Sequence, residues 1–308
     1  MYAFITPNPS IFYGYQSYFR IFSMNAPFLD TLEVTGSFAK HVDILQLPSR
    51  TSLRVYKHIS DYCEADLFKF VPKLAPHLEF LSLPRCMERY DRCDPLSGTK
   101  AVERAAGPPG FSLYELSFSG PFPWLQWTLS STRNTLTILD LHDSLSEDHF
   151  EAILSAHGAS LRSLRLSNAE HPLPDKASVS LSHCVRLQEF RYVHLPSDAT
   201  LDHLPLSTLE HLELTLDNRK FNNMGIRLAS LANWIAKSKL SIFTWNWLDV
   251  PMIWNPWRDI NRLVEVCIDS RIELRYFEPP LGTWTGERYA QPLFYLSYSL
   301  HSYLPLTT

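Results

Sequence analysis

The densest group of ionisable side chains in this sequence is the segment DLHDSLSEDH at residues 140–149. Closely spaced carboxylates and imidazoles are the groups that hold metal ions or transfer protons in catalysis. The segment contains neither His-Glu-x-x-His nor two histidines close together on one helical face. The acidic residues of its SEDH part are instead typical of a helix start, where they lie near the positive end of the helix dipole. We therefore predict neither a metal site nor a catalytic site here.

The other reactive residue types form no recognisable signature. Cys184 follows His183, but the sequence has no Gly-x-Ser-x-Gly motif and no known Cys/His nucleophile pattern. The segments SGTK and GPPG lack the spacing of a phosphate-binding loop. The cysteines are odd in number and form no Cys-x-x-Cys pair, which argues against a disulfide framework and a structural zinc site. We expect a protein that is not an enzyme and that uses no cofactor.

Composition limits the classes of partner. The 28 basic and 32 acidic residues give a formal net charge of −4, and neither sign forms a run, so we expect no nucleic-acid partner. No apolar stretch approaches the roughly 18 residues that a membrane-spanning helix needs. The first residues also lack the basic region of a secretory signal. We expect no membrane partner and a location in the cytoplasm or the nucleus.

The elements that position these residues come from a short repeat, Leu-x-x-Leu-x-Leu, which recurs along nearly the whole chain. It is clearest as LTILDL, LRSLRL and LEHLEL. Counting aromatic and degenerate versions, the repeats start at Leu29, Leu53, Leu78, Leu113, Leu136, Leu161, Leu187, Leu209, Leu240 and Arg271. Most successive starts lie 22 to 26 residues apart, in or near the roughly 20 to 29 residues of one leucine-rich repeat.

This period predicts an α/β fold, a leucine-rich-repeat solenoid shaped as an open curved horseshoe. Positions four and six of each repeat alternate along a short strand and point inward. The segment at 146–158 is helical in pattern, with a serine at its start, a glycine at its end and an apolar stripe of Phe150, Ile153 and Leu154. The segments from Pro123 and Leu228 are similar. Strand followed by helix predicts a parallel concave sheet with helices on the convex side.

The expected organisation is one solenoid at residues 29–280, with a polar loop inserted near residues 86–110. Residues 1–28, with the aromatic segment at 11–22, are expected to form an N-terminal cap, and residues 281–308 a C-terminal cap or an extension. The register before Leu78 has an alternative, because HVDILQL, which ends at Leu47, also fits the template.

Positions three, five and seven are expected to be exposed on the concave sheet. The position-five column consists of Glu33, Lys57, Ser82, Ser117, Asp140, Arg165, Arg191, Glu213, Thr244 and Arg275, and its neighbours include Glu115, His142, Glu189, His211 and Phe277. We predict that a protein partner of unknown identity binds Asp140, His142, Arg165, Arg191, His211, Glu213 and Arg275. Alternatively, the pairs Asp140 with Arg165 and Arg191 with Glu213 only stabilise neighbouring strands, by about 0.2 to 1 kcal/mol each. Both interpretations can hold together.

Aromatic residues late in the chain are a second candidate interface, because tryptophan and tyrosine are enriched at binding hot spots. They are Trp245, Trp247, Trp254, Trp257, Tyr276, Phe277 and Trp284. The alternative is packing: in this register Trp245 and Tyr276 point inward and Trp257 begins a helix. The loop after Trp247, with two tryptophans among prolines, is the part that burial explains least.

The strings LTILDLHDS, LRSLRLSN and WLQWTLSSTRNTL, together with the loose spacing, resemble fungal F-box/leucine-rich-repeat proteins over about residues 28–280. In that family an N-terminal F-box binds the Skp1 adaptor of a ubiquitin ligase, and the concave surface selects the substrate. No F-box is recognisable here, since the nearest candidate, at residues 47–67, has the wrong spacings and lacks the terminal tryptophan. The resemblance implies substrate recognition for an SCF-type ligase with a Skp1-like adaptor. The alternative is a stand-alone scaffold or inhibitor of the ribonuclease-inhibitor type.

Overall fold

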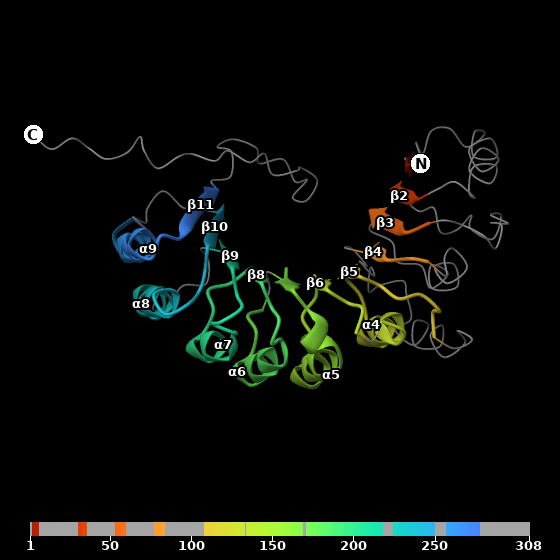
Figure 1. Ribbon diagram of the computed structural model, residues 1–308, viewed down its shortest axis with the longest axis horizontal. Coiled ribbons are helices and arrows are strands. Elements are labelled where there is room, and N and C mark those ends of the chain that lie inside the picture. Colours follow the sequence, from red (N-terminus) through yellow and green to blue (C-terminus); the bar gives the residue numbers. More distant parts are fainter. Residues whose placement is uncertain are drawn as a thin grey trace, which may run out of the picture.

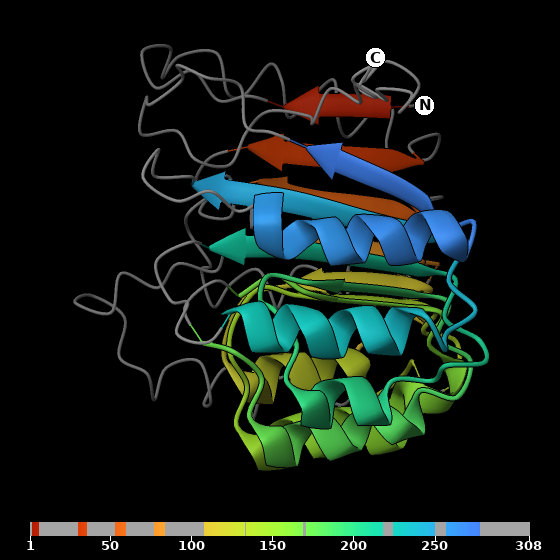
Figure 2. The ribbon, with the colours of Figure 1, turned by 90° about the vertical axis from the view of Figure 1, so that its left-hand side faces the viewer.

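One open parallel sheet organises the chain. The computed structural model describes residues 2–5, 30–35, 53–59, 77–83, 108–132, 134–168, 171–217, 224–249 and 257–277. Within them, eleven strands lie side by side in the order of the sequence, and every neighbouring pair is parallel (Figures 1 and 2). The strands are β1 (Tyr2–Ile5), β2 (Thr31–Thr35), β3 (Val55–Ile59), β4 (Phe80–Leu83), β5 (Glu115–Phe118), β6 (Ile138–Leu141), β7 (Ser163–Leu166), β8 (Glu189–Tyr192), β9 (His211–Asp217), β10 (Ile242–Asp249) and β11 (Glu273–Phe277).

The described helices all cover the same face of the sheet. Figure 1 shows the strands along the inner side of an arc and the helices along its outer side. They are α4 (Phe122–Leu129), α5 (Glu147–His157), α6 (Asp175–Ser178), α7 (Asp198–His203), α8 (Met224–Ile235) and α9 (Trp257–Asp269), with 3-10 turns η3 (Gly158–Ser160) and η4 (Val179–His183). The fold is therefore α/β, and the opposite face of the sheet, here named the open face, is free of described helices.

The alternation of side chains along each strand explains the two faces. On β6, the leucines Leu139 and Leu141 are buried while Ile138 and Asp140 are part-exposed, because successive strand side chains point to opposite faces. Strands β4 and β8 share this pattern. The predicted burial is confirmed for Leu139, Leu141, Leu164, Leu166, Leu212 and Leu214, none of which is more than 9% exposed.

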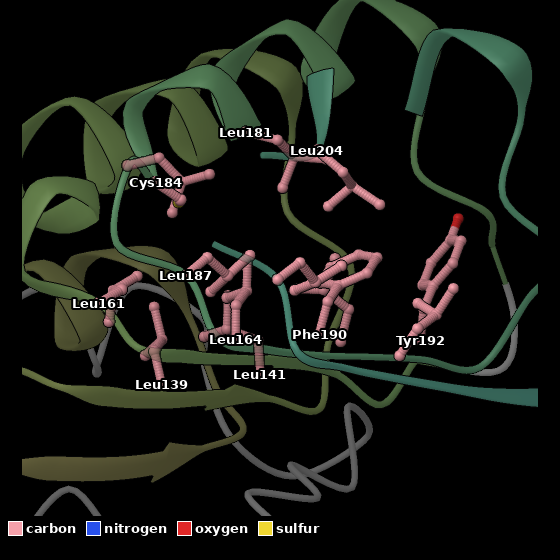
Figure 3. Close-up of a cluster of buried hydrophobic side chains, with 14 of the residues drawn as sticks. Leu139, Leu141, Leu161, Leu164, Leu181, Cys184, Leu187, Phe190, Tyr192 and Leu204 are labelled. Atoms are coloured by element: carbon pink, nitrogen blue, oxygen red, sulfur yellow. The ribbon is translucent and has the colours of Figure 1, made fainter. Parts of the chain in front are cut away.

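Position-four side chains form the spine of the core. From β2 to β10 they are buried to within 1% exposure, and they are Leu32, Tyr56, Leu81, Leu116, Leu139, Leu164, Phe190, Leu212 and Phe243. In Figure 3, Leu161, Leu164, Leu187 and Phe190 lie between the strands and the outer turns, with Leu181 and Cys184 on the side of the turns. Each repeat thus buries its apolar side against the next repeat.

The register before Leu78 follows the starts at Leu29 and Leu53. Strands β2 and β3 pair Glu33 with Lys57, and β3 and β4 pair Lys57 with Ser82, so the position-five column continues without a shift. Strand β1 was not predicted. Its pairing places Ala3 opposite Leu32, so position one of its repeat would fall before Met1, and the leucine pattern could not reveal it.

Helix α5 has the predicted limits, and the structure shows why a glycine follows it. The Ser146 hydroxyl accepts a hydrogen bond from the His149 amide, and Phe150, Ile153 and Leu154 are buried, as predicted. Gly158 has φ of −53°, so it is not a left-handed cap. A Cβ there would lie 2.9 Å from Cβ of His183. Glycine is needed because the next repeat packs closely against this turn.

Several predicted features lie outside the described residues. They are the aromatic segment at 11–22, the alternative strand that ends at Leu47, most of the inserted loop near 86–110, Trp254 with the two prolines around it at 250–256, and the C-terminal segment at 281–308. They stay predictions.

Candidate functional site

The predicted surface residues lie on the open face in a single register. Position five runs without interruption from Glu33 on β2 to Arg275 on β11. In the centre, Asp140, Arg165, Arg191 and Glu213 occupy four neighbouring strands, β6 to β9, with each residue directly opposite the next. His142 and His211 lie at positions seven and three of their repeats. The structure therefore brings six of the seven predicted residues into one continuous patch. The seventh, Arg275 on β11, is separated from Glu213 on β9 by Thr244 on β10.

Glu189, at position three of β8, is the centre of this patch. Its carboxylate accepts hydrogen bonds from Ser163 Oγ at 2.6 Å and Arg191 Nε at 2.7 Å, and lies 3.4 Å from Arg165 Nη2. His211 Nδ1 lies 3.5 Å from the same carboxylate. Arg191 also reaches Glu213 at 3.2 Å. We call this set of residues the Glu189 hub.

The contacts of Glu189 lower the pKa of its carboxyl by more than burial raises it. Burial alone would raise the pKa of this carboxyl, since it disfavours the charged form. The hydrogen bonds from His211 and Ser163 and the charge of Arg191 outweigh burial and hold the pKa well below its ordinary value. Glu189 is therefore ionised at neutral pH and separates two arginines that face each other directly on neighbouring strands. Without an anion between them, such like charges would repel.

Both predicted ladder pairs lie directly opposite each other on neighbouring strands, but only one of them forms an ion pair. Arg191 and Glu213 form an ion pair, whereas Arg165 reaches Glu189 and forms none with Asp140. Asp140 instead accepts a hydrogen bond from Ser167 Oγ at 2.9 Å and lies 3.4 Å from His142 Nε2. Position five of one strand pairs with position three of the next because the long arginine side chain reaches diagonally.

Asp140 is held in its charged form by these neighbours. Burial would raise the pKa of its carboxyl, but the contacts with His142 and Ser167 and the charge of Arg165 lower the pKa below the ordinary value. Asp140 and Glu213 are each 16% exposed at the side chain, and Arg165 is 25% exposed. The predicted central column is therefore part-exposed and held in place by internal contacts before any partner binds.

Some open-face positions predicted to be exposed are buried. Ser117 is 8% exposed, Ser163 5% and Thr244 2%. Each hydroxyl bonds to a longer side chain of a neighbouring strand: Ser117 to His142 at 2.9 Å, Thr244 to His211 at 2.8 Å. These short side chains are buried because the longer imidazole or carboxylate side chain on the adjacent strand covers the hydroxyl.

The two histidines bring acid, imidazole and hydroxyl groups together, and their geometry argues against proton transfer. His142 approaches both Ser117 Oγ and Asp140 Oδ2 through the same nitrogen, Nε2. One nitrogen carries either a proton or a lone pair, so it cannot relay a proton between them. In the catalytic arrangement the acid and the hydroxyl face different nitrogens.

His211 does face its acid and its hydroxyl through different nitrogens, Nδ1 toward Glu189 and Nε2 toward Thr244. However, Thr244 is almost fully buried. It also lies on β10, a strand paired on both sides, so its neighbouring amides are engaged in the sheet. Acyl transfer needs free amide donors around the developing oxyanion. The arrangement fixes the orientation of these side chains.

The segment at 140–149 is divided between the sheet and α5. Asp143 accepts hydrogen bonds from Ser119 Oγ and the Gly120 amide, so it ties two repeats together. His149 stacks on Phe122 with ring centroids 3.6 Å apart. Within the part of the chain that the structure describes, no three His, Cys, Asp or Glu side chains come together as a metal site would require.

The remaining reactive candidates have structural surroundings. Burial raises the pKa of the Cys184 thiol to about 12, so it is not a thiolate at neutral pH. His183 Nε2 lies 2.9 Å from Glu151. Trp245 is 2% exposed and points into the core, as predicted, and α9 begins at Trp257. Arg275 pairs with Glu273 on its own strand at 2.8 Å. None of the helices in the described ranges is long and apolar enough to cross a bilayer.

The sequence interpretation placed Glu189 only beside the main column, and the structure makes it the residue on which the others converge. A signal was present: in this register a glutamate at position three lies next to arginines at position five of its own and the preceding strand.

Comparison with known proteins adds no family. Neither the protein-family models nor the curated proteins compared with this sequence give a match.

Proposed function

We propose that this chain is a leucine-rich-repeat protein whose open face binds another protein. The observation that carries the proposal is the uninterrupted position-five column with the Glu189 hub at its centre. Ten of the eleven described strands coincide with the ten predicted leucine repeats, and they pair in sequence order, as expected for this repeat class. A surface of part-exposed, mixed charges held in fixed positions favours recognition of a partner with complementary charges.

A preformed surface reduces the cost of association. Arg165, Arg191, Glu213 and His211 are already held by Glu189 and by one another, so a partner need not order them. Immobilising a long side chain costs about 0.5 to 1.5 kcal/mol, and such a cost is avoided when the side chain is held in the free protein. The two acid–imidazole–hydroxyl groups lack the geometry of a relay or the donors for a reaction, so binding explains the open face better than catalysis.

The resemblance to F-box/leucine-rich-repeat proteins makes substrate recognition for an SCF-type ubiquitin ligase the leading role, with a Skp1-like adaptor as the second partner. A stand-alone scaffold or inhibitor uses the same open face and needs no adaptor, so it remains the alternative. The two roles differ in one measurable property, the presence of the adaptor in complexes with the full chain.

Affinity capture with matched variants tests the proposal. The open-face variant carries His142→Ala, Val193→Arg and Arg275→Ala, all at part-exposed positions three, five or seven of their repeats and outside the Glu189 hub. The control carries Lys176→Ala, Asp202→Ala and Glu265→Ala, which are exposed on the outer helices α6, α7 and α9. Circular dichroism melting first establishes that both variants are folded.

We expect partners that are captured by the original chain and the control variant and lost from the open-face variant. Among them, a Skp1 adaptor supports the ligase role, whereas a stoichiometric partner without an adaptor supports the scaffold or inhibitor role. A partner set that is the same for all three proteins contradicts binding through the open face.

A further inference from the structure

One carboxylate on the open face has no partner among the described residues. Positions three, five and seven of β5 to β11 carry five carboxylates and three guanidinium groups in the described part of the chain. Four of the carboxylates are engaged: Asp140 by His142 and Ser167, Glu189 by the hub, Glu213 by Arg191 and Asn246, and Glu273 by Arg275. Glu115 is the exception, since its carboxylate forms no hydrogen bond or ion pair with any described residue.

The surroundings of Glu115 disfavour the charged form of its carboxyl. It lies at position three of β5, directly between Phe80 on β4 and Ile138 on β6. Burial raises the pKa of its carboxyl, and the charges of Asp140 and Glu189 add to this effect. Lys57 and Arg165 act in the opposite direction through their charges, but neither forms an ion pair with it. A carboxylate between two apolar side chains loses hydration and gains no compensating donor.

We propose that Glu115, Phe80 and Ile138 form a subsite for a lysine or arginine side chain of a basic protein segment. Phe80 and Ile138 are both part-exposed on the open face. The aliphatic stem of such a side chain packs on apolar surface while its charged head reaches a carboxylate. The Lys57 ammonium already lies 5.5 Å from the centre of the Phe80 ring, so this ring accommodates a cation nearby.

The charge of the surrounding face favours the same partner. With the histidines neutral, the open-face positions from β2 to β11 carry six carboxylates, counting Glu33, against three guanidinium groups and the Lys57 ammonium, so the described face is net negative. An acidic segment would meet the carboxylates of Glu115 and Asp140, while Arg191 and Arg275 are already paired with glutamates of the chain. The subsite rests on the proposed function, because it names the chemistry of the partner that the open face binds.

Peptide binding to the full chain tests the subsite directly. The probes are fluorescein-labelled nonapeptides of alternating Arg–Ser, Gln–Ser and Glu–Ser sequence, titrated by fluorescence anisotropy at physiological salt. The test variant is Glu115→Gln, which keeps the shape and removes the charge. Its control is Glu265→Gln on the exposed part of α9, which changes the net charge of the protein equally.

We expect the Arg–Ser peptide to bind more tightly than the other two, and Glu115→Gln to raise its Kd about fivefold. Glu265→Gln should change that Kd less than twofold, and Glu115→Lys should abolish the preference for the basic peptide. Equal effects of the two glutamine variants, no preference for the basic peptide, or no binding at all would overturn the subsite. A dimer of the chain that dissociates on Glu115→Gln would place a second copy there and also overturn it.

The capture experiment and the peptide titration together distinguish a failure of the subsite from a failure of the proposed function. A protein partner that is lost from the open-face variant but binds Glu115→Gln normally overturns the subsite and leaves the open face as the binding surface. If the open-face variant captures the same partners as the original chain, both the subsite and binding through the open face are overturned.

Discussion

The Glu189 hub gives the sharpest prediction from this structure, because one substitution removes the anion that separates two arginines. Glu189→Gln keeps the size of the side chain and its capacity to accept a hydrogen bond from Ser163. It removes the charge that Arg191 contacts at 2.6 Å and that Arg165 approaches at 3.4 Å. The two guanidinium groups, opposite each other on β7 and β8, then repel with no carboxylate between them, and only Arg191 keeps an ion pair, with Glu213.

The magnitude follows from the partial burial of the hub. A hydrogen bond to a charged group contributes about 1.5 to 3 kcal/mol net. Several donors share the Glu189 carboxylate, and their contributions do not add. The side chain of Glu189 is 19% exposed and that of Arg191 is 36% exposed, so solvent screens part of the attraction. We therefore expect Glu189→Gln to lower the free energy of unfolding by about 2 to 3 kcal/mol.

Urea denaturation followed by far-ultraviolet circular dichroism measures this loss. The control is Glu210→Gln, an exposed glutamate just before β9, which we expect to change the free energy of unfolding by less than about 0.5 kcal/mol. A Glu189→Gln variant as stable as this control would refute the reasoning, since the two arginines would then tolerate each other without the carboxylate.

The same pair of proteins has a defined pH dependence. The folded-state pKa of Glu189 is lowered from its ordinary value of 4.5. A lowered carboxyl pKa contributes stability that is fully present above the unfolded-state value and is lost as the pH falls toward the folded-state value. The stability difference between the original chain and Glu189→Gln should thus be constant above about pH 5.5 and shrink below about pH 4.5. A difference that grows on acidification would contradict the direction of the shift.

Three further predictions concern the packing of the repeats. Gly158→Ala should lower the free energy of unfolding by about 1 to 3 kcal/mol, despite the better helix propensity of alanine, because the new Cβ would meet Cβ of His183 at 2.9 Å; an unchanged urea midpoint would show that the turn can move apart. Leu164→Ala, in the fully buried position-four column, should cost about 2 to 5 kcal/mol by the same assay, and a loss below 1 kcal/mol would be inconsistent with a packed core there. The Cys184 thiol, whose pKa burial raises to about 12, should react with a thiol reagent only after urea unfolds the chain, as mass spectrometry of the labelled peptide will test; rapid labelling in the folded protein would contradict its burial.

The sequence determined ten of the eleven described strands, their faces and their order of pairing, because the leucine pattern carries that information locally. Each leucine at position four or six specifies a buried side chain, and a spacing near one repeat specifies a parallel neighbour. The position-five column from Ser82 to Arg275 therefore follows from the leucine pattern, whereas its start at Glu33 and Lys57 needed the strand pairing to decide between two registers. The start and the buried stripe of α5 were equally local, since the capping serine and the apolar spacing lie within one segment.

What only the tertiary structure decided is how side chains of neighbouring repeats share their contacts. The register places Asp140 opposite Arg165, yet Arg165 reaches Glu189, because an arginine can choose between acids on two strands. The leucine template gives no distance between a carboxylate and the donors of the next repeat. The central role of Glu189 and the isolation of Glu115 depend on such distances. Gly158 is similar, since its close contact comes from His183, one repeat further along the chain.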